Sequence, residues 1–154
     1  MAEREGSSVV SENYLRKAER RIEHGRVVEV LTNLPLHSKL ILCSMYLLSK
    51  SNIQYAITGD IYEVYSELCG LTNFTALTQR RISGIINELD TMGLMNTRVV
   101  SLGRYGRTKK IFLAIDKQPI QEVFSEDSRL GKLIQYSPRC LLNRSEEQIQ
   151  RIEG

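Results

Sequence analysis

The sequence predicts a mainly α-helical fold with one small β-hairpin, and three observations support this. Apolar residues recur at helical spacing in several segments between residues 11 and 92. Two stretches rich in β-branched residues, 94–101 and 110–115, then flank a glycine-containing turn. The chain has 154 residues, of which 42% are hydrophobic and 25% charged, which suits one globular domain with appended helices.

The first 34 residues predict two short helices. Ser11 can cap the first helix, and Gly25 is a plausible stop for it. A second helical run follows over 26–34, before Pro35 breaks it.

The middle of the chain predicts three further helices, over 38–49, 58–68 and 79–92. Thr58 and Thr78 are the expected caps of the last two, and Ile57 is expected to be a short extended element. After the two strands, residues 119–134 predict another amphipathic helix, interrupted near Asp127, and the last twenty residues predict a polar, weakly ordered tail.

The order of the elements over 36–115 is helix, short strand, helix, helix, strand, turn and strand, which is typical of a winged helix-turn-helix. We therefore divide the chain into three parts. These are residual helices over 1–34, a winged-helix domain over 35–116, and a C-terminal helix with a polar tail over 117–154.

Composition excludes several classes of protein. No apolar run reaches the roughly 18–20 residues of a membrane span, and no secretory signal is visible at the charged N-terminus. The three cysteines, Cys43, Cys69 and Cys140, are odd in number and widely spaced, which argues against a disulfide framework or a zinc site. We therefore expect a cytoplasmic protein without a membrane partner.

The position of the positive charge is more informative than its total. The chain carries 21 Lys and Arg against 18 Asp and Glu, a net charge of only +3. Residues 78–110 alone hold seven basic and two acidic side chains, a net charge of +5. This concentration favours a polyanionic partner, and a solvated basic surface is the alternative.

The 79–92 helix has an apolar stripe and a polar face opposite it. In a helix-turn-helix the polar face enters the major groove, where Arg can pair with guanine and Asn or Gln with adenine. Thr78 or the N–H groups of the first turn can hold a phosphate. Gly84 lies on the same face, and close approach to DNA or to the preceding helix would explain it.

The turn between the strands is the sharper feature. Gly103 and Gly106 permit a tight tip that leaves Arg104, Tyr105 and Arg107 exposed. Arg inserted into a narrow minor groove is an established mode of recognition, and a bare hairpin is the alternative. The lysines that follow suit phosphate contacts, or discourage pairing of sheet edges. The candidate DNA-binding residues are Thr78, Gln79, Arg80, Arg81, Ser83, Asn87, Arg104, Tyr105, Gly106, Arg107, Lys109 and Lys110.

No catalytic or metal site can be assigned from the sequence. His24 and His37 have no partner motif and are expected in surface or capping roles. Cys43 and Cys69 are expected as small core residues. Glu63 and Glu67, four residues apart, are most simply a solvated helix face.

Five segments, taken in order, carry a resemblance to a known family. They are 34–39 (LPLHSK), 58–62 (TGDIY), 77–81 (LTQRR), 86–94 (INELDTMGL) and 103–109 (GRYGRTK). Together they resemble the C-terminal part of archaeal replication initiators of the origin-recognition and cell-division-control type, over about residues 7–116. Residues 8–34 look like the last helices of the AAA+ lid in such proteins, and 36–115 look like the winged helix.

The resemblance implies binding to double-stranded origin DNA in the nucleoid. Thr78, Gln79, Arg80 and Arg81 match the recognition helix in the major groove, and Arg104, Tyr105 and Arg107 match the wing in the minor groove. The family binds ATP with Mg²⁺ in its AAA+ module, but no G-x-x-x-x-G-K-[ST] phosphate loop occurs in these residues. We therefore expect neither an enzyme nor a cofactor site, but a fragment or an initiator relative that lacks the ATPase.

A second hypothesis is a protein-interaction winged helix. The same surface could dock another initiator subunit, the replicative helicase or the missing ATPase domain, with Tyr105 and the 119–134 helix as anchors. A third hypothesis, nucleotide hydrolysis, is disfavoured because the phosphate loop is missing from these residues.

Overall fold

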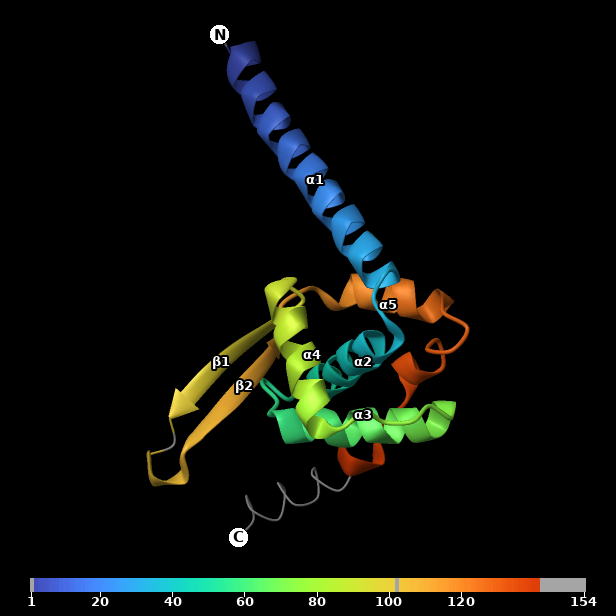
Figure 1. Ribbon diagram of the computed structural model, residues 1–154. Helices are drawn as coiled ribbons and strands as arrows, with labels where there is room; N and C mark the ends of the chain where they lie inside the picture. Colours follow the sequence, from blue (N-terminus) through green and yellow to red (C-terminus); the bar gives the residue numbers. More distant parts are fainter. Residues whose placement is uncertain (1, 102, 142–154) are drawn as a thin grey trace, which may run out of the picture.

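The computed structural model describes residues 2–101 and 103–141, which form a helical body with two projections (Figure 1). One projection is a two-stranded hairpin and the other is the long first helix. The elements follow in the order α1 (Ala2–Thr32), α2 (Leu36–Lys50), α3 (Thr58–Thr72), α4 (Gln79–Thr91), β1 (Met95–Ser101), η1 (Gly103–Tyr105), β2 (Arg107–Leu113), α5 (Lys117–Glu126) and η2 (Leu133–Gln135). The predicted mainly α-helical class with a small antiparallel sheet is confirmed.

The N-terminal helix is continuous, so the prediction of two short helices is wrong. Ser11 lies inside α1 and does not cap it, and Gly25 keeps the helical backbone. A glycine in a helix costs about 1 kcal/mol relative to alanine, which is too little to end a helix that packing supports. Leu31 is fully buried and Val27 and Val30 pack against the core, so tertiary contacts hold the C-terminal part of α1.

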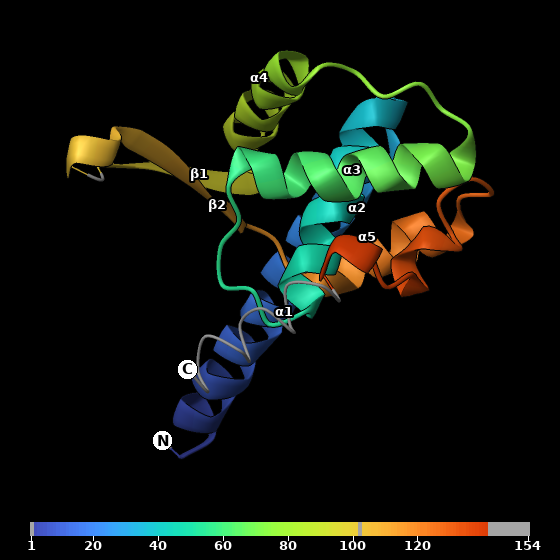
Figure 2. The same cartoon turned by 90° about the horizontal axis from the view of Figure 1, so that it is seen from below.

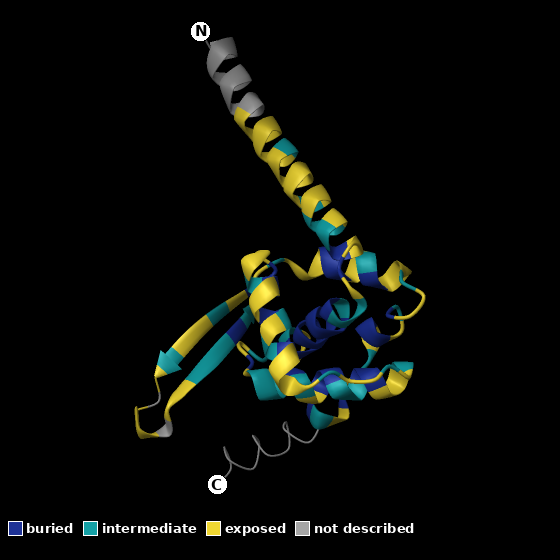
Figure 3. Cartoon of the chain, in the orientation of Figure 1, coloured by how far each residue is buried: buried dark blue, intermediate teal, exposed yellow. Residues whose placement is uncertain are grey.

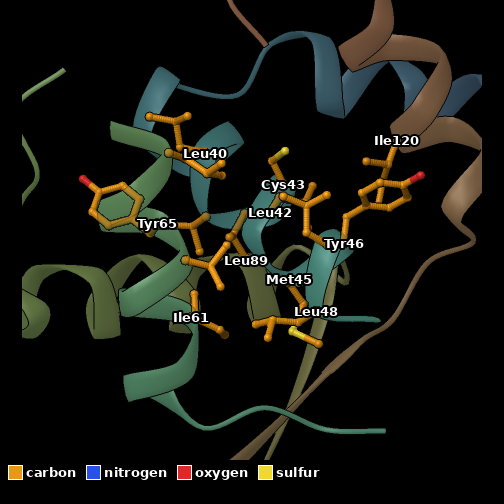
Figure 4. Close-up of a cluster of buried hydrophobic side chains, with 14 of the residues drawn as sticks. Leu40, Leu42, Cys43, Met45, Tyr46, Leu48, Ile61, Tyr65, Leu89 and Ile120 are labelled. Carbon is orange, nitrogen blue, oxygen red and sulfur yellow. The ribbon is translucent and has the colours of Figure 1, made fainter. Parts of the chain in front are cut away.

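The second helix is the centre of the molecule. All residues of α2 from Leu40 to Leu48 are buried, which agrees with the prediction of a mostly buried helix. A helix that is apolar on every side must be covered on every side. Figure 4 shows this packing, with Ile61 and Tyr65 of α3, Leu89 of α4 and Ile120 of α5 around α2.

Two of the helix starts differ in how they are capped. The Thr78 hydroxyl accepts a hydrogen bond from the Arg81 N–H at 3.3 Å, so the predicted cap of α4 is confirmed. The predicted cap at Thr58 is wrong, because Thr58 is already the first helical residue of α3. There the Ile57 N–H donates to the Asp60 carboxylate at 3.1 Å, and this acid satisfies the helix start from inside the first turn.

The second strand of the hairpin begins and ends earlier than predicted, and the hairpin is fastened to the body. Its register runs from Met95 opposite Leu113 to Ser101 opposite Arg107, so β2 begins three residues before the expected strand. Ala56 forms an isolated antiparallel bridge with Ile111, with N···O distances of 2.9 and 2.8 Å. Because an isolated two-stranded hairpin is only marginally stable, this bridge helps to hold the hairpin at the body.

The C-terminal segment packs against α3. The predicted interruption near Asp127 is confirmed, since α5 ends at Glu126. The predicted weakly ordered tail is wrong for 135–141, and its remaining residues, 142–154, lie outside the described part. The Arg139 N–H donates to the Glu67 carboxylate at 2.8 Å, the Tyr136 hydroxyl donates to the same oxygen, and Leu141 is buried. Glu67 therefore anchors this segment and is not part of a purely solvated face.

Candidate nucleic-acid interface

The first half of the candidate interface is the outer face of α4. Ile82, Ile86 and Leu89 are fully buried and fix the inner face of the helix against the body. Figure 3 shows the opposite face exposed to solvent. The predicted residues on or beside this face are exposed, except for half-buried Ser83; they are Thr78, Gln79, Arg80, Arg81 and Asn87.

Two tyrosines that the sequence reasoning missed hold the start of this helix. The Tyr62 hydroxyl donates to the Leu77 carbonyl at 3.0 Å, and the Leu77 N–H donates to the Tyr65 hydroxyl at 2.9 Å. Both backbone groups of the residue before Thr78 are thus bound to α3. Burial raises the pKa of Tyr65 to about 12, so its hydroxyl stays protonated at neutral pH. The spacing of the tyrosines, three apart on α3, was the available signal.

Gly84 lies on the outer face with open space around it. Apart from its chain neighbours and the adjacent backbone of α4, no heavy atom of the described residues lies within 4 Å of the position that a Cβ would take there. Close approach of the preceding helix, one of the two explanations expected from the sequence, is therefore wrong. Close approach of DNA, the other explanation, stays a prediction.

The second half of the candidate interface is the wing, which projects from the body beside α4 (Figure 2). Gly103 and Gly106 have φ values of +65° and +83°, a region that side chains with a Cβ rarely adopt, and this confirms the predicted glycine-dependent turn. Arg104 and Arg107 are exposed at or beside the tip. The Tyr105 side chain lies outside the described part of the structure.

The two lysines of the wing lie on opposite faces of the hairpin. Lys109 faces α4, where its Nζ donates to the Asn87 Oδ1 at 2.6 Å. Lys110 lies directly opposite Arg98 in the sheet register, an arrangement of like charges that destabilises a strand pair. Aromatic rings offset this cost, because the Lys110 Nζ lies 4.3 Å from the Tyr55 ring centroid and the Arg98 guanidinium lies 5.6 Å from that of Phe112.

The hairpin and α4 are joined by side-chain hydrogen bonds. The Thr97 hydroxyl of β1 donates to the Asp90 carboxylate of α4 at 2.5 Å. The Lys109 contact to Asn87 joins β2 to the same helix. The two basic elements therefore have a fixed orientation relative to each other.

The positive charge of this surface is not neutralised by ion pairs. Among the described side chains, no ion pair joins a basic residue of 78–110 to a carboxylate. Ion pairs do form elsewhere, for example between Lys39 and Asp127 and between Arg129 and Asp127, each at 3.7 Å. A basic surface of this kind is the electrostatic pattern expected of a protein that binds a polyanion.

The other reactive residue types take structural positions. The His24 Nε2 lies 2.9 Å from the Glu122 carboxylate, and the His37 Nδ1 lies 2.7 Å from the Tyr65 hydroxyl. Burial raises the pKa of the Cys43 thiol to about 12, so this cysteine is an inert core residue. In residues 2–101 and 103–141 no group of three potential metal ligands occurs, and none of the helices there could span a membrane.

Three packed helices, α2, α3 and α4, followed by a two-stranded wing, define a winged helix domain. The third of these helices, α4, carries the exposed basic face. Residues 29–123, more than half of the chain, match the family described as "CDC6, C terminal winged helix domain". The chain belongs to this family, which confirms the resemblance to archaeal replication initiators.

Curated relatives and solved structures agree with this assignment. The chain is 44% identical to an ORC1-type DNA replication protein of Thermococcus onnurineus and 46% identical to one of Pyrococcus furiosus. Each match covers 89% of this chain but 33% of the relative, so the chain spans about one third of their length. The structure of the Aeropyrum pernix ORC1 protein in complex with DNA is 42% identical with a TM-score of 0.74, and the match covers 79% of this chain and 31% of that one.

Proposed function

We propose that this chain binds duplex DNA at replication origins, as the DNA-binding part of an archaeal replication initiator. The observation that carries the proposal is the basic surface that α4 and the wing form together, with no ion pair among its described side chains. In this proposal α4 lies in the major groove and the wing in the minor groove. The similarity to an ORC1 protein whose structure contains DNA supports it.

The twelve residues named from the sequence are the proposed contacts, with Thr78 and the first turn of α4 at a phosphate. No cofactor is required for this activity, since ATP and Mg²⁺ would belong to a phosphate-loop module that these residues do not include. The protein would act in the cytoplasm, on the nucleoid.

The wing provides the direct test. Arg104→Ala combined with Arg107→Ala should strongly weaken duplex binding, and should lower the slope of log affinity against log salt by about 2. Fluorescence anisotropy of a labelled duplex at several salt concentrations measures both quantities. The matched control is Arg16→Ala with Arg20→Ala, because both arginines are exposed on α1, away from the proposed interface. Unchanged binding by the wing variant would refute the wing assignment.

Docking of another protein is the second candidate function. A cavity of about 350 Å³ lies between the ends of α1 and α4, and its apolar lining includes Val30, Leu34, Leu89 and Met92. Met92 is 48% exposed, so an apolar side chain of a partner could contact it at this cavity. An apolar contact there would withstand moderate salt, whereas DNA binding would weaken steeply, so the same salt series separates the two functions.

A further inference from the structure

Asn87 and Lys109 form a pair at the junction of the helix and the wing. Asn87 lies on the outer face of α4, in line with Arg80 and Gly84 on the helical wheel. Lys109 lies in β2, on the face of the hairpin that meets α4. The Lys109 Nζ donates to the Asn87 Oδ1 at 2.6 Å, and the charge of the donor strengthens this hydrogen bond.

This contact changes what Asn87 can recognise. An asparagine that reads adenine donates from Nδ2 to N7 and accepts at Oδ1 from the N6 amino group. Here an ammonium group already donates to Oδ1. An incoming amino group would meet that positive charge at the same oxygen, so the second half of the adenine contact is opposed.

The pair presents mainly donors, because the lone pair of Oδ1 that Lys109 leaves free lies beside the positive charge of its ammonium group. The Asn87 Nδ2 has two N–H groups, and the Lys109 Nζ has two further protons beyond the one directed at Oδ1. In the major groove, guanine offers two neighbouring acceptors, O6 and N7, and no donor on that base. The chemistry of the pair therefore matches guanine.

We propose that Lys109 determines the base preference of Asn87, and that the pair selects guanine over adenine at one position of the DNA site. Lys109 acts here as a positioning residue, because it fixes the orientation of the carboxamide and holds a positive charge beside its oxygen. The inference rests on the proposed function and names the specificity of that same surface.

Selection from a pool of duplexes with randomised sequence, followed by sequencing of the bound fraction, tests the proposal. The wild-type chain should prefer guanine at one position, and Asn87→Ala should remove that preference. Lys109→Met should lower the ratio of guanine to adenine there by about tenfold.

Lys110→Met is the matched control, because Lys110 is the neighbouring lysine on the opposite face of the hairpin. Either lysine variant should lower the salt slope by up to about 1, because each removes one positive charge from the surface. Only Lys109→Met should change the base preference.

The outcomes separate this inference from the function on which it rests. An unchanged ratio of guanine to adenine in Lys109→Met, or a wild-type chain that binds DNA without a base preference, overturns the inference and leaves duplex binding standing. A wild-type chain that does not bind duplex DNA refutes the proposed function, and the inference with it.

Discussion

Gly84 lies in the middle of α4, and no close contact within the described part of the chain explains why a glycine is needed there. A glycine there costs about 1 kcal/mol relative to alanine, and a Cβ would meet no atom within 4 Å. We predict that Gly84→Ala raises the free energy of unfolding by up to about 1 kcal/mol but weakens duplex binding, because the methyl group would meet the DNA backbone. Urea unfolding and fluorescence anisotropy measure the two effects.

The control for this substitution is Gly70→Ala. Gly70 is an exposed glycine of α3, also with nothing within 4 Å of its Cβ position. It should stabilise the protein similarly and leave the affinity for DNA unchanged. If Gly84→Ala also binds DNA normally, then DNA does not approach α4 at this residue.

Glu67 makes stability depend on pH. Burial alone would raise the pKa of this carboxyl, but hydrogen bonds from the Arg139 N–H and the Tyr136 hydroxyl outweigh burial and lower it below its ordinary 4.5. A carboxyl whose pKa is lower in the folded state stabilises the fold above its unfolded pKa, and this contribution is lost as the pH falls through the folded value. Asp127 contributes to stability with the same pH dependence. Burial would raise the pKa of its carboxyl, but hydrogen bonds from the Arg129 and Leu130 N–H groups lower it below the ordinary 3.8.

We therefore predict that Glu67→Gln lowers the free energy of unfolding by about 1 kcal/mol at pH 7, and that the difference from wild type closes below pH 4. Thermal unfolding measured from pH 7 to pH 3 checks this. Glu126→Gln, at an exposed residue at the end of α5, is the control and should change little at any pH. A constant difference across the whole range would contradict the role assigned to the carboxylate.

At the scale of elements, the angle between α4 and the wing depends on few contacts. We predict that Thr97→Val lowers the free energy of unfolding by about 1 kcal/mol, because the half-buried Asp90 loses the hydroxyl that donates to it. Thr97→Ser keeps this hydroxyl and should retain most of the stability. Urea unfolding of both variants gives the comparison, and equal losses would show that the methyl group of Thr97 matters and the hydrogen bond does not.

At the scale of the whole molecule, α1 belongs to the folded body only in part. Ile22 is 67% exposed, whereas Leu31 is fully buried. Figure 3 shows that the part of α1 that projects from the body is mostly exposed. We predict that Leu31→Ala costs about 2–5 kcal/mol, and that Ile22→Ala changes stability by less than about 0.5 kcal/mol. Calorimetric unfolding of both variants tests this. Similar losses in both would mean that the N-terminal part of α1 unfolds together with the body.

Local signals in the sequence were sufficient for most of the elements. The apolar stripe of α4, its cap at Thr78 and the glycines of the turn all act within a few residues, so their pattern can be read from the chain. The failures have a common physical cause. Gly25 did not end α1, and residues 135–141 did not form a loose tail, because contacts with distant residues outweighed weak local preferences.

Some properties of the candidate site could likewise be predicted from the sequence, and others could not. Its residue types and the charge of +5 over residues 78–110 follow from the sequence. The contact between Asn87 and Lys109 could not be predicted, because the two residues lie 22 positions apart and their alignment depends on how the hairpin packs on α4. The attachment of Leu77 to Tyr62 and Tyr65 depends in the same way on the packing of α3 against the loop before α4.

The class of fold, the order of the elements over 36–115 and the segment that carries the positive charge could all be predicted from the sequence. These properties depend on the periodicity of apolar residues and on composition, which are local. Tertiary packing was needed to show which basic side chains point to solvent, which are engaged by neighbours, and how α4 and the wing are oriented. Those properties depend on side chains brought together from distant positions, and a linear pattern does not record such distances.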